Sequence, residues 1–242
     1  MLILAKSGNT PEIFHTVQGE GRNVGMPTIF VRLSLCNLHC VWCDAYYTFN
    51  WVGTPWKSNF PKVEKPDYQI QLEPLEVLEN IRRLSNCQNI VLTGGEPLLQ
   101  QKQLVPLLIQ LKELGYWIEI ETNGTIIPIV DQYIDQYNCS PKLTNSANPH
   151  RIREKEDALM FFSSSTKTWF KFVIQNEGDL EEVLSLITRY KIPRERTFLM
   201  PEGITSEELH IKSGWLVDVC KQYGLRFSSR LQIELYGLKP LT

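Results

Sequence analysis

The sequence lacks the features that would place the protein in or across a membrane. Among its 242 residues, no apolar run reaches the roughly 18–20 residues needed to span a bilayer. Residues 1–10 lack the charged and then apolar order that is typical of a signal peptide. We therefore expect no membrane partner and a cytoplasmic location, where thiols stay reduced.

The sequence also lacks an excess of either charge. Its net charge is −2, so no basic surface is indicated and no nucleic-acid partner is expected. There is no internal repeat, no low-complexity tract and no linker that would separate domains. A hydrophobic content of 43% is ordinary for a chain with a buried core. We expect a single domain covering residues 1–242.

Cysteine is scarce outside one short segment. Cys36, Cys40 and Cys43 lie within eight residues, with the spacing C-x3-C-x2-C. Thiolates bind iron–sulfur clusters, usually four to a cubane. Three thiolates on one loop would hold three corners and leave one iron open to a cofactor or substrate. The three other cysteines are dispersed, and we interpret them as small buried residues: Cys87, Cys139 and Cys220.

Two other interpretations of the cysteine segment stay open at this point. Closely spaced cysteines often bind structural zinc, which takes four ligands. No second cysteine pair follows at zinc-finger spacing, and His39 lies between two of the candidate ligands, where its reach is poor. The thiols could also be buried and inert.

Apolar residues from position 74 onward alternate between strand and helix patterns. We predict strands at residues 28–35, 89–93, 116–120, 169–175 and 197–200, one ending near 139, and helices near 74–84, 104–114, 151–164, 180–187 and 205–223. About six such units fit, fewer than the eight of a closed barrel. The predicted fold class is α/β, with an open, partial (β/α)6-type barrel. Residues 126–136 are ambiguous, and residues 225–235 are predicted to be extended.

An aromatic-rich insertion follows the cysteine segment. Residues 44–72 contain seven aromatic residues and three prolines without a period of 2 or 3.6. Long irregular loops in compact domains are often functional. We therefore consider two interpretations, a lid over the site and a surface excursion that packs its aromatics onto the barrel.

Polar motifs follow the predicted strands at the ends where a barrel site would lie. They are Thr93-Gly94-Gly95-Glu96-Pro97, Glu119-Ile120-Glu121-Thr122-Asn123-Gly124 and Ser140-Pro141-Lys142. Each motif alone is weak evidence, because such residues also form turns and caps. Parallel strands place their carboxyl ends at one edge, so a single pocket would collect these motifs together with the cysteines.

Taken with Gln18-Gly19-Glu20-Gly21, these motifs resemble the 7-carboxy-7-deazaguanine synthase family of radical S-adenosylmethionine (radical SAM) enzymes. The resemblance runs from about residue 12 to the end, with residues 44–72 the least similar part. It implies a partial barrel, a homodimer, a [4Fe–4S] cluster, SAM and Mg²⁺. It also implies ring contraction of 6-carboxy-5,6,7,8-tetrahydropterin to 7-carboxy-7-deazaguanine with loss of ammonia, in queuosine biosynthesis. An electron donor such as flavodoxin would reduce the cluster.

The resemblance assigns a role to each matching residue. The cluster ligands are Cys36, Cys40 and Cys43. The implied substrate contacts are Val17, Gln18, Gly19, Glu20, Arg32 and Thr93. The implied SAM contacts are Gly94, Gly95, Glu96, Glu121, Asn123, Ser140, Pro141 and Lys142. Many relatives bind Mg²⁺ through a Thr or Ser where this chain has Ala45, so the metal site is in doubt, and Thr48 is the nearest substitute.

Arg32 supports this assignment on physical grounds. It lies in the middle of a predicted strand, and a side chain pointing into the barrel would need an anionic partner. A substrate carboxylate would supply one. The alternative within the superfamily is a glycyl-radical activase or another maturase, and the alternative outside it is a zinc-stabilised binding module without enzymatic activity.

Overall fold

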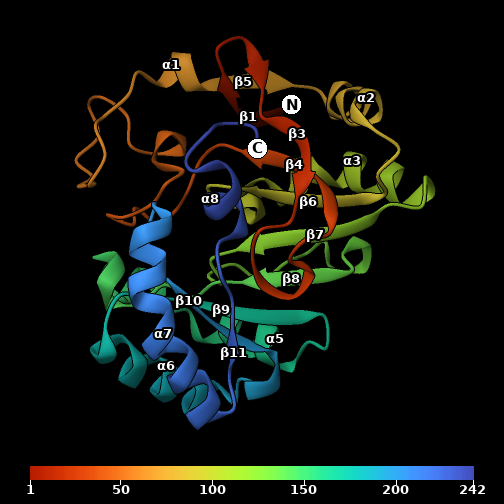
Figure 1. Cartoon of the computed structure of the whole chain (residues 1–242). Coiled ribbons are helices and arrows are strands. Elements are labelled where there is room, and N and C mark those ends of the chain that lie inside the picture. Colours follow the sequence, from red (N-terminus) through yellow and green to blue (C-terminus); the bar gives the residue numbers. More distant parts are fainter.

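The computed structural model describes all residues, 1–242, and is built on one sheet (Figure 1). The strand order is β11-β10-β9-β8-β7-β6-β4-β1-β2. Seven consecutive strands of this order are parallel. They are six longer strands, β4 (Pro27–Leu33), β6 (Asn89–Gly94), β7 (Trp117–Thr122), β8 (Gln136–Cys139), β9 (Thr168–Ile174) and β10 (Thr197–Pro201), and the short β11 (Arg226–Phe227). The strands at the two ends of the order do not pair with each other, so the sheet stays open. The predicted α/β fold with a partial (β/α)6-type barrel is confirmed.

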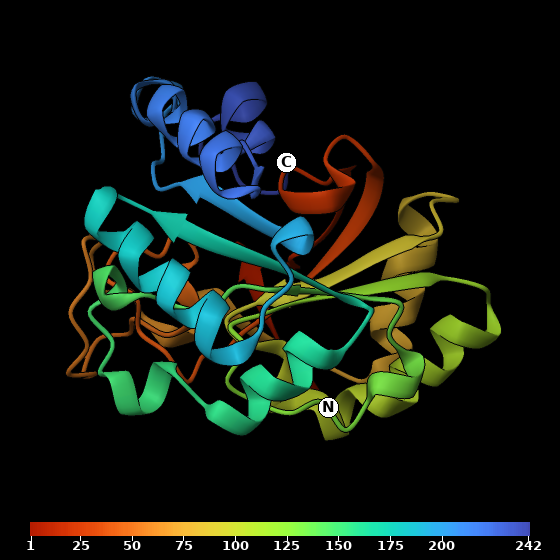
Figure 2. The same cartoon turned by 90° about the horizontal axis from the view of Figure 1, so that it is seen from below.

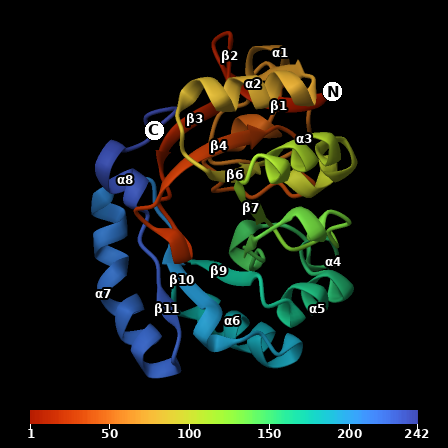
Figure 3. The same ribbon diagram turned by 90° about the vertical axis from the view of Figure 1, so that its right-hand side faces the viewer.

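Helices cover the convex face of this curved sheet (Figures 2 and 3). They are α2 (Pro74–Leu84), α3 (Gln101–Glu113), α4 (His150–Arg153), α5 (Glu156–Ser164), α6 (Glu177–Tyr190) and α7 (Ser206–Tyr223). Between helices and sheet lies a core cluster of 38 buried residues. None of these six helices covers the concave face, and this is where the site lies.

The alternation of side chains along the strands separates the core from the site. Val31 and Leu33 of β4 belong to the buried core, whereas Arg32 between them lines the cavity on the concave face. Lys171 of β9 lines the same cavity, while its neighbour Phe172 is in the core. A charged residue inside an apolar strand is therefore the sequence signal of the concave face.

Helices α2 and α7 begin with capping boxes. Pro74 occupies the first turn of α2, whose capping box is formed by Glu73 and Glu76. The capping box at the start of α7 is formed by Thr205 and Glu208. The helix predicted at residues 151–164 is divided into α4 and α5, and residues 126–136 contain only the short η4 (Asp131–Tyr133) before β8.

The amino-terminal part contains strands that the sequence analysis missed. They are β1 (Leu2–Ser7), β2 (Thr10–Pro11), β3 (Ile13–Val17) and, after α1 (Lys65–Tyr68), β5 (Gln69–Leu72) at the end of the insertion. β5 pairs with β1, where Leu2 faces Leu72, and β3 pairs with β4. These strands are held by distant partners, which local patterns do not reveal.

The carboxyl-terminal prediction is wrong in part. Only β11 (Arg226–Phe227) is extended, and Leu231–Tyr236 form the short helix α8. Only Ile233 of α8 is buried, so the helix has no apolar stripe to detect. Figure 3 shows α8 between β3 and α7, at the open side of the barrel. None of the helices combines the length and apolar character that crossing a membrane requires.

Candidate active site

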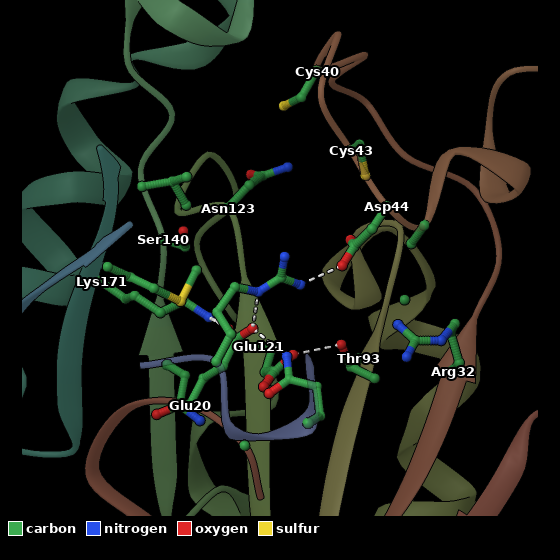
Figure 4. A pocket seen from close by; sticks show the side chains of 18 of the residues that line it. Glu20, Arg32, Cys40, Cys43, Asp44, Thr93, Glu121, Asn123, Ser140 and Lys171 are labelled. Atoms are coloured by element: carbon green, nitrogen blue, oxygen red, sulfur yellow. Dashed lines mark hydrogen bonds and ion pairs between the residues drawn. The ribbon is translucent and has the colours of Figure 1, made fainter. Parts of the chain in front are cut away.

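One cavity on the concave face collects the residues that the sequence analysis selected (Figure 4). Those lining it are Val17, Gln18, Gly19, Glu20, Arg32, Cys36, Cys40, Cys43, Ala45, Thr48, Thr93, Gly94, Gly95, Glu121, Asn123, Ser140 and Lys142. In Figure 4, Cys40 and Cys43 lie at one end of the cavity and Glu20 at the other. The joint placement at the strand ends is therefore as predicted, although the ligand that each residue contacts stays a prediction.

The loop with the three cysteines is fixed by neighbouring strand-end loops. Asn123 donates to Asn37 Oδ1 at 2.8 Å, and Asn37 in turn donates to Thr125 Oγ1 at 2.8 Å. On the other side, Trp42 Nε1 donates to the carbonyl oxygen of Asn145 at 3.1 Å. Asn123 was predicted to contact SAM, but its side chain first serves to hold the cysteine loop.

The Gly-Gly turn is required by its close approach to the base of this loop. A Cβ on Gly94 would overlap the carbonyl oxygen of Leu33, and one on Gly95 would overlap that of Leu35. Gly94 also has a φ of +128°, which favours glycine. Leu35 itself adopts a left-handed φ of 75°, held by bonds from its N–H to Thr48 and from Glu96 N–H to its carbonyl oxygen.

The three thiols line one cavity and do not gather around the position of a single ion. No group of three or more His, Cys, Asp or Glu side chains is placed to hold one metal ion, which argues against structural zinc. Burial raises the pKa of Cys36 to about 12 and raises the pKa values of Cys40 and Cys43. Such thiols need a metal to become thiolates, and a cluster bound along the cavity wall would provide it.

Two predicted SAM contacts, Glu96 and Pro141, do not line the cavity. Glu96 is fully buried and accepts hydrogen bonds from Leu98 N (3.0 Å), Thr122 Oγ1 (2.9 Å) and Asn123 N (2.7 Å). Its carboxylate therefore joins the turn after β6 to the loop after β7. The glycines of the same motif remain exposed to a ligand.

Lys142 and Ser140 form the wall next to the cysteines. Lys142 Nζ donates to the carbonyl oxygen and to Oγ of Ser140, at 2.9 and 2.8 Å. Its ammonium also lies 5.9 Å from the ring centre of Trp42. This places one cation beside the cysteine loop, where the carboxylate of SAM would find a partner.

Glu121 joins polar groups of the cavity that come from two other segments. Thr93 Oγ1 donates to one of its carboxylate oxygens at 2.7 Å, and Gln18 Nε2 donates to the other at 3.3 Å. All three residues line the cavity. Glu121, predicted to contact SAM, thus holds two residues that are predicted to contact the substrate.

Glu20 is the centre of an ionic network that the sequence analysis missed. Its carboxylate pairs with Lys171 and with Arg230 Nε (3.0 Å), and it accepts from Gln232 Nε2 (2.6 Å). Burial favours the protonated acid, but the charges of Lys171 and Arg230 outweigh it and hold the pKa of Glu20 well below its usual range. Burial lowers the pKa of Lys171, but the negative charges of Glu20 and Glu121 outweigh it, so the pKa of Lys171 is raised.

Gly19 is needed for this network to form. A Cβ at this position would overlap the side chain of Gln232 in α8. The backbone also joins these segments, because Leu231 N donates to Gly19 O at 3.0 Å. The only sequence signals were Lys171 as a charge within an apolar strand and the Gly-rich turn around Gly19.

Arg32 has an internal partner, contrary to the expectation that a ligand must supply one. Its Nε lies 2.8 Å from Glu12 Oε2, and Tyr47 donates to the same oxygen at 2.9 Å. The two terminal nitrogens have no protein hydrogen bond and face the cavity (Figure 4). The expected anionic ligand therefore still has two donors available.

The residues predicted for Mg²⁺ do not fit the metal well. Ala45 offers no side-chain oxygen, and the buried hydroxyl of Thr48 donates to the carbonyl oxygen of Ala45 at 2.8 Å. The carboxylate of Asp44, the residue before Ala45, pairs with Arg230. Mg²⁺ needs about six oxygens, and side chains 45 and 48 supply at most one.

The aromatic insertion packs against the cysteine loop. Trp56 stacks on His39 with ring centres 3.6 Å apart, and Tyr46 stacks on Phe60 at 4.7 Å. Trp51 and Val63 form an isolated bridge. The aromatics therefore pack onto the barrel as in the second interpretation, and the lid stays a prediction.

Comparisons with known proteins agree with this geometry. Residues 31–155 match the model of the radical SAM superfamily, so the chain is a radical SAM protein. It is 36% identical to 7-carboxy-7-deazaguanine synthase from Pyrobaculum aerophilum over 93% of both chains. It is 32% identical to the synthase from Halobacterium salinarum, covering 96% of this chain and 91% of the relative. The chain belongs to the 7-carboxy-7-deazaguanine synthase family.

The fold is also shared with a solved structure. The crystal structure of QueE from Escherichia coli aligns with a TM-score of 0.68 and 24% identity, over 95% of this chain and 94% of that one. Family membership identifies a [4Fe–4S] cluster, SAM and Mg²⁺ as the cofactors and decides against the zinc-stabilised binding module.

Proposed function

We propose that this enzyme converts 6-carboxy-5,6,7,8-tetrahydropterin into 7-carboxy-7-deazaguanine, with loss of ammonia, in queuosine biosynthesis. The observation that carries the proposal is the single cavity with three thiols at one end and buried ionic groups at the other (Figure 4). A radical generated at the thiol end would reach a polar substrate held at the other.

A cluster held there would, when bound with SAM, supply the electron that cleaves SAM to methionine and a carbon-centred radical. The chain's own residues bind and orient the reactants. Cys36, Cys40 and Cys43 would hold the cluster, and Lys142 would pair with the carboxylate of SAM. Gly94 and Gly95 line the cavity, so their backbone groups would meet the methionine part of SAM.

The substrate end has donors and acceptors that match a carboxylated pterin. The terminal nitrogens of Arg32 would pair with the carboxylate, because a guanidinium makes planar two-point contacts. Glu20 and Glu121 would accept from the ring N–H and amino groups. Their positions are fixed by Lys171, Arg230 and Thr93, so no reorganisation is needed on binding.

We further propose the partners that the sequence analysis expected. The substrate is a small molecule, an electron donor such as flavodoxin reduces the cluster, and the enzyme is a homodimer of single-domain chains covering residues 1–242. One sheet and one 38-residue core support the single domain. No step is assigned to Mg²⁺, because residues 45 and 48 do not supply its ligands.

Anaerobic reconstitution followed by assay tests the function. The wild-type protein should bind four irons per chain and, with SAM and a reductant, convert the carboxypterin to the deazapurine. Cys40→Ala should lose cluster and activity together, whereas Cys220→Ala, on α7 away from the cavity, should keep both. Cluster binding without turnover of the pterin would contradict the substrate and favour the activase or maturase alternative.

A further inference from the structure

Asn148 is a buried amide that neither the resemblance nor the proposed function uses. It lies between η5 (Thr144–Ser146) and α4, in the loop that begins with Ser140-Pro141-Lys142. It is 7% exposed. The preceding Ala147 adopts a left-handed φ of 60°, a conformation that costs energy for a residue with a Cβ. The chain therefore accepts local strain to turn Asn148 inward.

Both ends of the Asn148 amide contact the cysteine loop. Nδ2 donates to Cys40 Sγ at 3.3 Å, and Oδ1 accepts from His39 N at 2.9 Å. The orientation of the amide is fixed, because only its oxygen can accept from the backbone N–H of His39. Nδ2 must then face the sulfur, with Ser146 Oγ as its second partner at 3.2 Å.

The other two thiols have no such side-chain donor. Cys36 Sγ accepts only from the backbone N–H of Leu38, at 3.5 Å, and no side chain donates to Cys43. Val41 N donates to Ser146 O at 3.2 Å, so the two loops are also joined through their backbones. The side chain of Ser146 also reaches Cys40, but Asn148 is the side chain that bonds both the sulfur of Cys40 and the backbone of its loop.

We propose that Asn148 is a positioning residue that fixes Cys40 and raises the reduction potential of the cluster. This inference rests on the proposed function, because it requires a cluster on the three cysteines. Hydrogen bonds to the sulfurs are among the factors that set cluster potentials. A donor stabilises the additional negative charge of the reduced cluster, so it makes reduction easier. Outer residues of this kind also keep ligands in place.

The test compares three variants of the full-length, reconstituted protein. Asn148→Asp keeps an oxygen for His39 but removes the donor to Cys40, and Asn148→Ala removes the donor without adding charge. Asn145→Ala is the control. Asn145 lies in the same loop as Asn148, but its side chain donates to the carbonyl oxygen of Val173 and to Asp179 and does not reach a thiol. Iron content, midpoint potential by EPR-monitored titration and SAM affinity are measured for each.

Both Asn148 variants should have more negative midpoint potentials than wild type, whereas Asn145→Ala should keep the wild-type potential. SAM affinity should be unchanged in all three. An unchanged potential in Asn148→Asp with full iron content would overturn the proposal. Loss of the cluster from both folded Asn148 variants would overturn the effect on the potential and leave only the hold on Cys40. If the wild type binds no cluster, the proposed function fails instead.

Discussion

Arg230 pairs with Asp44, the residue that directly follows the third cysteine, and so joins α8 to the cysteine loop. The same guanidinium bonds Glu20 Oε1 through Nε (3.0 Å) and the carbonyl oxygen of Gly203 through Nη1 (2.6 Å). Three loops from different parts of the barrel therefore meet on one side chain.

We expect Arg230→Ala to reduce both stability and substrate binding. It would leave the buried Glu20 with one cation fewer, and breaking a buried ion pair costs about 3–5 kcal/mol. The exposed Asp44 adds little to this. Urea unfolding and pterin KM measure the two effects. Lys221→Ala, which removes an exposed ion pair with Asp218, should change stability by less than about 1 kcal/mol. If Arg230→Ala and Lys221→Ala lowered the free energy of unfolding equally, this would argue against a network centred on Arg230.

Arg32→Lys should raise the pterin KM by about tenfold while SAM affinity stays the same, which corresponds to about 1.4 kcal/mol. A lysine can still pair with Glu12 but cannot present two parallel donors to a carboxylate. Steady-state kinetics and calorimetry with SAM separate the two ligands. A variant with normal KM but reduced stability would show that Arg32 serves only to hold Glu12 and Tyr47.

Turnover should depend on Mg²⁺ only weakly and at high concentration. With Ala45 in place of a hydroxyl residue, the metal would be held mainly by substrate oxygens and water. In a magnesium titration, Ala45→Thr should make activity rise more steeply and at lower Mg²⁺ concentration. Ala45→Val should not, because valine has the shape of threonine but lacks its hydroxyl oxygen. Tight Mg²⁺ binding without substrate would contradict this, and activity indifferent to chelation would remove the metal from the reaction.

Glu96 should make stability fall as pH rises through the weakly acidic range. Burial raises its pKa to about 6, above the usual 4.5, despite three donors. The folded state therefore favours the protonated acid, and its contribution is complete below pH 4.5 and lost as pH rises through about 6. Relative to Glu96→Gln, wild type should lose up to about 2 kcal/mol across this range in anaerobic urea unfolding. Glu113→Gln, at an exposed position, should show no such trend. If the stability difference between wild type and Glu96→Gln did not change with pH, the raised pKa of Glu96 would be refuted.

The parallel part of the fold could be predicted because each of its units is local. Leu104, Leu107 and Leu111 mark one face of α3, and Ile90 to Leu92 form a continuous apolar strand. The strands near the amino terminus could not be predicted in this way, because β1 is defined by pairing with β5 and β4 from elsewhere in the chain.

The site shows the same division between local motif and distant contact. The cysteines and the Gly-Gly turn are short sequence motifs, so they could be recognised directly. Their position in one cavity could be predicted because both follow the carboxyl ends of parallel strands. Lys171, Arg230 and Gln232 were missed because their function comes from Glu20, which is distant in sequence. Glu96 was misplaced for a related reason: its motif indicates a ligand contact, but its donors lie in the next strand-end loop.

The left-handed backbone of Leu35 has a consequence for how the enzyme acquires its metal. The conformation just before Cys36 is held by Glu96, which is synthesised well after the cysteines. A nascent chain ending before residue 93 is therefore expected to bind little iron, which pull-down of stalled chains with labelled iron would measure. The cysteine loop would therefore bind iron only after β6 has paired with β4, and not as soon as the thiols leave the ribosome. During synthesis the cysteines would thus be exposed to oxidation for the time needed to make some fifty further residues, about 3–10 s at typical elongation rates.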